Sequence, residues 1–212
     1  MNNKLLISGV LGLGTCMIYT PIHAGEAQAQ SKPNVLIIYT DDMGAGDVSF
    51  LNNGWVKTPN IDKLASGGLI VTNYYSSSPV SSPSRVGLTT GRFPTEMGIN
   101  CYLQKRKGNT SCEQFDYLYA SVPTMAKVMK SAGYTTGHFG KWHMGGGRDV
   151  IDAPQITEYG FDEYISTWES PNPDPVITDS AWIWSRTDQV KRWDRTAYFV
   201  DKTLDFLKRH KG

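Results

Sequence analysis

The sequence lacks an excess of charge of either sign, a long basic run, metal-binding cysteine spacing and internal repeats. It has 21 Lys and Arg against 20 Asp and Glu, a formal net charge of +1. No cluster of cations is long enough to form a groove for nucleic acid. The three cysteines show no CxxC or His-rich spacing typical of a zinc site. These absences exclude nucleic-acid-binding, zinc-finger and repeat proteins.

A hydrophobic run long enough to span a membrane is also missing. The apolar stretch 5–18 is short for a span, but it follows Lys4 and precedes small residues at Ala24 and at Ala27 to Ala29. This pattern predicts a signal peptide at 1–29, leaving 30–212 as an exported protein that is periplasmic or secreted. A membrane anchor and a lipoprotein attached through Cys16 are the alternatives. The lipoprotein ranks second because Thr15 is bulky for lipoprotein processing.

The rest of the chain has the composition of a globular domain. Hydrophobic residues make up 40% and aromatic residues 11% of the 212 residues, enough for one sizeable core. Cleavage of the signal peptide would leave Cys101 and Cys112 as an even pair in an oxidising compartment. We expect a disulfide between them, with two unpaired buried thiols as the alternative.

An acidic pair follows the first strand that the sequence predicts. Residues 34–40, NVLIIYT, form a continuous apolar run typical of a buried parallel strand, and Asp41 and Asp42 end it. Functional side chains in open α/β sheets collect at the carboxyl ends of strands. Adjacent carboxylates repel each other unless they share a cation, and Ca²⁺ or Mg²⁺ prefers oxygen ligands. The alternative is that both residues merely begin a loop.

The stretch 76–91, SSSPVSSPSRVGLTTG, predicts a helix with Ser81 just ahead of it. A helix opened by Pro59 and a strand at 69–75 lead the chain to this stretch. Ser82 is a good cap before Pro83, and a glycine at position 91 is a good stop. Ser81 would lie where backbone N–H groups favour negative charge, and Arg85 would point back at it from one turn on. A serine-rich loop capping an ordinary surface helix is the alternative.

Another strand-end group follows later in the chain. A helix at 122–132, with inner-face residues Met125, Val128 and Met129, precedes a strand at 134–139. Lys141 and His143 then lie two residues apart, which places both side chains on one face of an extended chain.

The remaining pattern predicts a strand at 160–165, a polar loop at 169–179 and a helix at 195–210 with Val200, Leu204 and Leu207 on one face. The order of these elements predicts an α/β fold with a mostly parallel sheet.

Three segments resemble the sulfatase family. The string S-S-P-S-R from Ser81, followed by L-T-T-G-R-F-P, is similar to the family signature whose first residue is oxidised to formylglycine. The segments T-D-D-M-G-A-G-D and G-K-W-H-M-G resemble its metal-binding and sulfate-contacting motifs. The resemblance implies an alkaline-phosphatase-like, doubly wound α/β fold, of which this chain is the N-terminal part. It also implies a serine-type enzyme matured by a radical sulfatase-maturating enzyme that does not need oxygen.

The resemblance further implies roles for six residues. Asp41, Asp42 and the modified Ser81 would bind Ca²⁺ or Mg²⁺, and Arg85 would stabilise the charged aldehyde hydrate. Lys141 and His143 would contact the sulfate group of a sulfated glycan or aryl substrate. His143 would also help remove a proton from the second hydroxyl of the hydrate. The remaining ligands of such a site are absent from the sequence, so we expect the chain alone to be nearly inactive.

Two other functions fit the same residues. One is a phosphonate or phosphodiester hydrolase of the same superfamily. The other is an exported glycan-binding module without catalysis, which would need no aldehyde at position 81.

Overall fold

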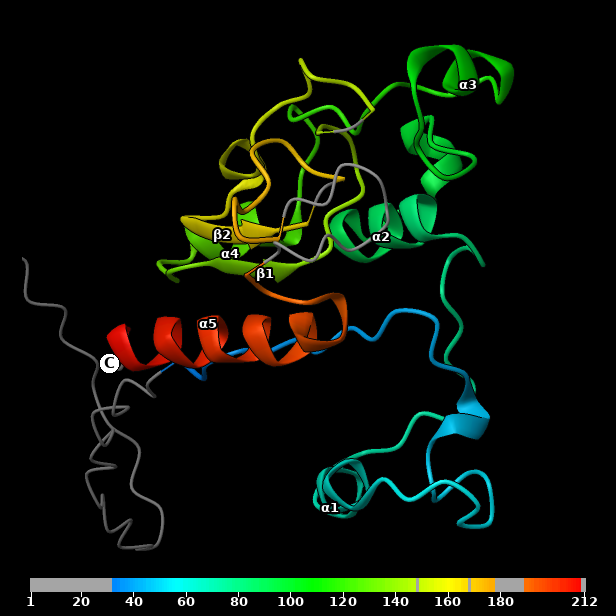
Figure 1. Cartoon of the computed structure of the whole chain (residues 1–212), viewed down its shortest axis with the longest axis vertical. Helices are drawn as coiled ribbons and strands as arrows, with labels where there is room; N and C mark the ends of the chain where they lie inside the picture. Colours follow the sequence, from blue (N-terminus) through cyan, green and yellow to red (C-terminus); the bar gives the residue numbers. More distant parts are fainter. Residues whose placement is uncertain (1–31, 148, 168, 178–188, 211–212) are drawn as a thin grey trace, which may run out of the picture. The chain divides into compact units, whose positions relative to one another are not determined.

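The computed structural model describes residues 32–147, 149–167, 169–177 and 189–210. The chain forms two compact units, Met1–Thr40 and Asp41–Gly212, and each is described by itself. The predicted signal peptide lies outside the described residues. The elements of the second unit, seen in Figure 1, are η1 (Ala45–Asp47), α1 (Pro59–Ser66), α2 (Ser81–Thr90), η2 (Pro94–Met97), α3 (Arg106–Ser111), α4 (Met125–Ser131), β1 (Gly137–Gly140), η3 (Ile156–Tyr159), β2 (Glu163–Ser166), η4 (Arg192–Asp194) and α5 (Arg195–Arg209).

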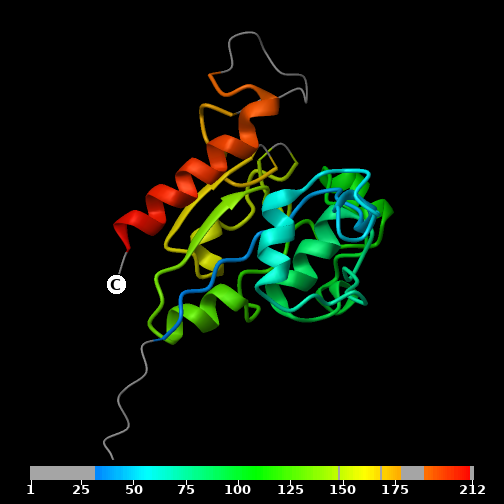
Figure 2. The same cartoon turned by 90° about the horizontal axis from the view of Figure 1, so that it is seen from below.

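A two-stranded parallel sheet confirms the predicted α/β class. Gly137 pairs with Glu163, and the register continues to Gly140 and Ser166 at the carboxyl ends of β1 and β2. Both strands lie within three residues of the predicted ranges. Helix α5 runs alongside the sheet in both views, and the rings of Phe139 and Phe206, 5.4 Å apart, join α5 to β1 (Figures 1 and 2).

The other two predicted strands are wrong. Residues 34–40 of the first unit and 69–75 of the second have no strand structure, and their apolar side chains are exposed. A strand needs a neighbour to accept its ladder of backbone hydrogen bonds. The only strands that pair within the described residues are β1 and β2. An apolar run alone does not supply a partner, so neither segment forms a strand, and residues 72–73 form a turn.

The predicted helices form, but with different inner faces. Helix α1 begins at Pro59 and ends before Gly67, as expected, although none of its residues is buried. Helix α4 begins only at Met125, because the Thr124 hydroxyl accepts the N–H of Lys127 as a cap. Its buried residue is Ala126 instead of the predicted methionines and valine. Helix α5 ends at Arg209 and buries Phe206, while the predicted inner residues of this helix remain exposed; they are Val200, Leu204 and Leu207. None of the described helices is long and apolar enough to cross a membrane.

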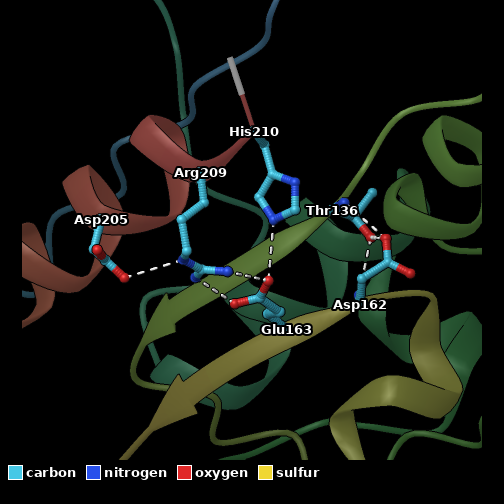
Figure 3. Close-up of polar contacts among 6 residues, drawn as sticks. All are labelled: Thr136, Asp162, Glu163, Asp205, Arg209 and His210. Carbon is cyan, nitrogen blue, oxygen red and sulfur yellow. Dashed lines mark hydrogen bonds and ion pairs between the residues drawn. The ribbon is translucent and has the colours of Figure 1, made fainter. Parts of the chain in front are cut away.

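Acidic residues at the start of β2 tie the sheet to the helices around it. The Asp162 carboxylate accepts the backbone N–H and hydroxyl of Thr136 and pairs with Lys130 of α4. The Glu163 carboxylate accepts two bonds from Arg209 of α5, at 2.8 and 2.6 Å (Figure 3). The two adjacent carboxylates therefore anchor β2 to one helix each.

The hydrophobic core lies around the segment that follows β1. The ring of Trp142, 1% exposed, packs against Tyr159 at a centroid distance of 4.9 Å. The core includes residues from α2, from the loop before α3 and from η3; its buried members are Val86, Ile99, Leu103, Leu118, Trp142, Met144, Ile156 and Tyr159. Because the Trp142 side chain is buried in this core, it fixes the backbone positions of its neighbours Lys141 and His143.

The two cysteines are thiols in the structure, in contrast to the predicted disulfide. Cys101 and Cys112 are both free and half-buried. Burial, followed by a hydrogen bond with Cys101, raises the pKa of the Cys112 thiol. The unpaired alternative therefore describes this structure, with the two side chains in contact.

Candidate active site

Ser81 is the first residue of helix α2. Val80 is the N-cap, in an extended conformation, and Gly91 ends the helix with a left-handed φ of 66°. The prediction that Ser82 caps the helix is wrong, because the helix starts two residues earlier than expected, at Ser81 instead of Pro83. The Ser82 hydroxyl is instead buried and accepts the backbone N–H of Leu103 at 2.9 Å. Ser81 thus lies in the first turn, where free N–H groups and the helix dipole favour negative charge.

The Lys141 side chain forms hydrogen bonds to both Ser81 and Asp41, the first residue of the acidic segment Asp41–Asp42. It follows Gly140, the last residue of β1, and its Nζ donates to Ser81 Oγ at 2.9 Å and to Asp41 Oδ2 at 3.0 Å. Its side chain is only 23% exposed. A partly buried ammonium in contact with a hydroxyl is well placed to stabilise negative charge that develops on that oxygen or on a group bound to it.

Arg85 connects the same segments from the other side. Its Nη1 donates to the backbone oxygen of Lys141 at 2.7 Å, and its Nη2 donates to Asp41 Oδ1 at 3.1 Å. The sequence predicted that Arg85 would point back at Ser81. The structure instead makes Lys141 the cation that bonds to Ser81, and Arg85 holds the Lys141 backbone in place. Four predicted residues from three separate segments therefore lie together.

The two cations determine the charge of Asp41. Partial burial by itself would raise the pKa of this carboxyl group, but the hydrogen bond and charge of Lys141 and the charge of Arg85 outweigh burial and lower it. Asp41 is therefore a carboxylate over the physiological pH range.

Asp42 lies beside this group without joining it. Its backbone has a left-handed φ of 54°, its side chain is exposed, and no hydrogen bond or ion pair holds its carboxylate within the described part of the chain. Two adjacent carboxylates, one of them unpartnered, are hard oxygen donors that fit Ca²⁺ or Mg²⁺. They supply only part of a coordination shell, because no group of three or more Asp, Glu, His or Cys gathers among the described residues.

His143 does not share a face with Lys141, so that prediction is wrong. β1 ends at Gly140, and His143 has a φ of 50°, which breaks the alternation of an extended chain. Lys141 points to Ser81, whereas the His143 ring is buried and bonds through Nε2 to the carbonyl oxygen of Leu103 at 3.2 Å. The link to the site is indirect, since Leu103 also donates to the residue after Ser81.

His138 and Glu169 support this region, although the sequence did not single them out. His138 Nε2 donates to the carbonyl oxygen of Gly140 at 3.2 Å, and its ring lies 5.4 Å from that of Trp142. Burial and then the charge of Arg85 lower the pKa of His138 to about 4. The carbonyl oxygen of Glu169 accepts the backbone N–H of His143 at 3.1 Å. A histidine before a strand end gives a weak local signal, and a glutamate in a polar loop gives none.

Comparisons with known proteins show which family the chain matches. The family model described as Sulfatase matches residues 33–212. Human steryl-sulfatase is 38% identical over 124 residues, which cover 57% of this chain and 20% of that protein. N-acetylgalactosamine-6-O-sulfatase of Bacteroides thetaiotaomicron is 36% identical over 163 residues, covering 74% and 30%. The chain therefore spans less than a third of the length of these relatives.

Solved structures show the same similarity. A Bacteroides thetaiotaomicron protein, described in work on the metabolism of multiple glycosaminoglycans, is 33% identical with a TM-score of 0.56; the match covers 68% of this chain and 30% of that one. Ps i-CgsB in complex with k-i-k-neocarrahexaose is 34% identical with a TM-score of 0.51, covering 61% and 27%. These likenesses confirm the alkaline-phosphatase-like α/β fold for the part that the chain spans.

Proposed function

The chain belongs to the sulfatase family, and on this premise we propose that the protein containing it hydrolyses a sulfate monoester at residue 81. The hydrogen bond between Lys141 Nζ and Ser81 Oγ carries this proposal, because it brings a cation to the family's reactive position. Sulfate esters repel anionic nucleophiles, so a cation beside the attacking oxygen lowers the barrier.

Each residue of the group has a distinct task. Lys141 neutralises sulfate oxygens as charge develops on them, and the N–H groups of the first turn of α2 favour the same charge. Arg85 fixes Lys141 by holding its carbonyl oxygen, and its charge stabilises an anionic form of residue 81. His143 accepts the proton of the second hydroxyl of the hydrated residue 81. Nδ1 is the nitrogen that takes this proton, because Nε2 bonds to the carbonyl oxygen of Leu103.

Residue 81 is the proposed site of oxidation to formylglycine. Ser81 is partly exposed at the helix start, which suits access by a serine-type maturating enzyme. Hydrated, the aldehyde would supply one hydroxyl whose oxygen attacks sulfur as the alcohol of the ester leaves. Deprotonation of the second hydroxyl would then expel sulfate and restore the aldehyde.

Asp41 and Asp42 would hold a divalent cation together with residue 81. Their oxygen donors fit Ca²⁺, with Mg²⁺ as the second choice. A bound ion would lower the pKa of the hydroxyl on residue 81 and polarise the sulfate oxygens. Two carboxylates give fewer than the roughly 6–8 oxygen ligands of Ca²⁺. For that reason we expect the 212-residue chain alone to turn over poorly.

The relatives favour a sulfated glycan as the substrate, with an aryl sulfate as a practical probe. One relative is named for a sulfated amino sugar and one structural neighbour holds a neocarrahexaose. We further propose that the signal-like N-terminus directs export to the periplasm or beyond, where such glycans occur.

The test uses the longer protein that contains this chain, co-expressed with a serine-type maturase. We expect peptide mass spectrometry to show an aldehyde at residue 81. The rate of sulfate release should be at least 100-fold lower in the Lys141→Ala variant. The Lys107→Ala variant, which changes an exposed lysine outside the site, is the control.

Each alternative function gives a different result. Protein without an aldehyde, or with unchanged turnover in Lys141→Ala, would refute the assignment. Aldehyde with turnover of phosphonate esters but not sulfate esters would indicate the phosphonate hydrolase. Sulfated-glycan binding without aldehyde would indicate a binding module.

A further inference from the structure

His143 is held in an unusual backbone conformation by two hydrogen bonds. Its φ of 50° is left-handed, which is uncommon for a residue with a side chain. Its backbone N–H donates to the carbonyl oxygen of Glu169, and its ring Nε2 faces the carbonyl oxygen of Leu103. Because a carbonyl oxygen only accepts, Nε2 carries the proton of the neutral ring.

The other ring nitrogen of His143 therefore carries the lone pair. Nδ1 is buried and has no hydrogen-bond partner among the described residues. The side chain as a whole is only 6% exposed. A proton that arrives at Nδ1 would create a buried cation, which is costly unless a negative charge lies nearby.

The Glu169 segment lies tightly against the turn that carries His143. Glu169 is 8% exposed and Ser170 is fully buried. A Cβ atom added to Gly146 would lie 2.3 Å from the nitrogen of Pro171, so the two segments are in direct backbone contact. The Glu169 carboxylate itself is oriented by the Thr167 hydroxyl, which donates to Oε2 at 3.1 Å.

Five effects act on the pKa of the His143 ring. Burial is the largest and lowers this pKa. The Glu169 carboxylate opposes burial most strongly, followed by the hydrogen bond to the Leu103 carbonyl oxygen and then by the charge of Asp149. Lys141 acts with burial and disfavours the protonated ring. Among the charged groups, the Glu169 carboxylate thus favours the protonated ring most strongly.

We propose that Glu169 is the positioning residue of His143: its carbonyl oxygen accepts the backbone N–H of His143 and so holds the left-handed turn that directs the imidazole, and its buried carboxylate balances the charge that arises when Nδ1 takes a proton. The consequence for turnover rests on the proposed function. The pairing itself is a property of the folded chain and is testable without activity.

The first experiment measures the titration of His143 by NMR in the 212-residue chain, with the resonance assigned from a His143→Asn variant. Glu169→Gln should shift the His143 titration to lower pH by about one unit, a tenfold loss of the protonated form at a given pH. Glu169→Asp should recover at least half of the shift. Glu96→Gln, which removes an exposed carboxylate in η2, should leave the titration unchanged.

A second measurement uses the unaltered chain, in case Glu169→Gln does not fold. The carboxyl carbon resonance of Glu169 should move at the pH at which His143 titrates, because the two groups sense each other's charge. A Glu169 resonance that ignores the His143 titration would overturn the proposal, as would a folded Glu169→Gln variant with an unshifted His143.

The longer protein then connects the pair to turnover. With equal aldehyde content, Glu169→Gln should alter the pH dependence of kcat by the same shift and leave KM for an aryl sulfate within about twofold. A pH profile that does not move would overturn the catalytic consequence. Protein that shows the NMR coupling but releases no sulfate would refute the proposed function and leave the pairing intact.

Discussion

Arg85 uses its two terminal nitrogens for two different acceptors. One binds the Lys141 carbonyl oxygen and the other binds the Asp41 carboxylate, so a planar fork connects the end of β1 with the acidic segment. A lysine ammonium is a single point charge on a flexible stem and cannot reproduce this geometry. The position of Lys141 relative to Ser81 should therefore depend on arginine at position 85, and not only on a positive charge.

We expect Arg85→Lys to lower sulfate release by the longer protein about 10- to 100-fold, which corresponds to about 1.4–2.8 kcal/mol of transition-state stabilisation. Rates on an aryl sulfate, corrected for aldehyde content, measure the effect. Arg92→Lys is the matched control, because Arg92 is exposed just after α2. Equal rates in both variants would show that charge at position 85 is sufficient.

His138 makes folding sensitive to mild acid. Burial and the charge of Arg85 lower its pKa from 6.5 to about 4 in the folded chain. Between these values the unfolded chain binds more protons than the folded chain, so stability falls as pH falls from about 6.5 to 4. Each pH unit of pKa shift is worth about 1.4 kcal/mol, and because the residue as a whole is only half-buried, the total is roughly 2 kcal/mol.

His138→Gln should remove this share of the pH dependence, because glutamine keeps an N–H donor and does not titrate. Urea unfolding at a series of pH values between 4 and 7 measures it. The variant should lose less stability than the original chain on acidification, and parallel pH profiles would contradict the assignment.

The sequence identified those site residues that can be recognised from the pattern of their own segment. Ser81 lies at a helix start and Asp41 follows an apolar run, so each is visible in its own segment. The burial of His143 was not predictable, because one left-handed backbone angle reverses the direction of its side chain. Glu169 was missed since its contact with His143 is made between distant segments and leaves no pattern in either.

At the scale of elements, β2 is fastened to helix α5 by an ion pair. Glu163 accepts both terminal nitrogens of Arg209 and also Nε2 of His210 (Figure 3). These hydrogen bonds, Arg209 first and His210 second, outweigh partial burial and lower the pKa of Glu163 from 4.5 to about 2. The ion pair therefore contributes stability above pH 4.5 and loses it as pH falls from 4.5 through 2.

Glu163→Gln should lower the midpoint temperature of unfolding at pH 7 by roughly 2 °C, since the partners are partly exposed and the attraction is screened. Differential scanning fluorimetry at pH 7 and near pH 2 measures it, and the two chains should converge in acid. Asp205→Asn, which removes only the pair between residues 205 and 209 within α5, is the control and should have a smaller effect. A difference that persists near pH 2 would point to packing instead of charge.

Helix positions were predictable because their ends are encoded within a few residues. Pro59 and Gly67 bound α1, and Gly91 ends α2, all by local backbone preferences. Strands at 34–40 and 69–75 were wrongly predicted because pairing depends on distant segments. The buried residues of α4 and α5 were also wrongly predicted, since burial depends on what packs against a helix and not on the periodicity of its sequence alone.

At the scale of the whole molecule, apolar side chains remain on the surface of the second unit. Leu69 is 89% exposed and Tyr75 81% exposed, and the outer face of α5 presents Val200 and Leu204 at half exposure. Large apolar side chains exposed to this degree are typical of segments that pack against other protein. The relatives are more than twice as long as this chain, because 124 matched residues cover only 20% of one and 163 cover only 30% of another.

We therefore expect the 212-residue chain to self-associate when purified alone, through surfaces that include the exposed face of α5. Sedimentation velocity over a range of concentrations should show oligomers, and Leu204→Lys should shift the population toward the monomer, because a charge on an apolar face opposes association. Thr196→Lys adds the same charge at an exposed polar position of α5 and is the matched control. If both variants reduce association equally, net charge and not the α5 face governs it; if the unaltered chain is monomeric at every concentration, the exposed side chains do not drive self-association.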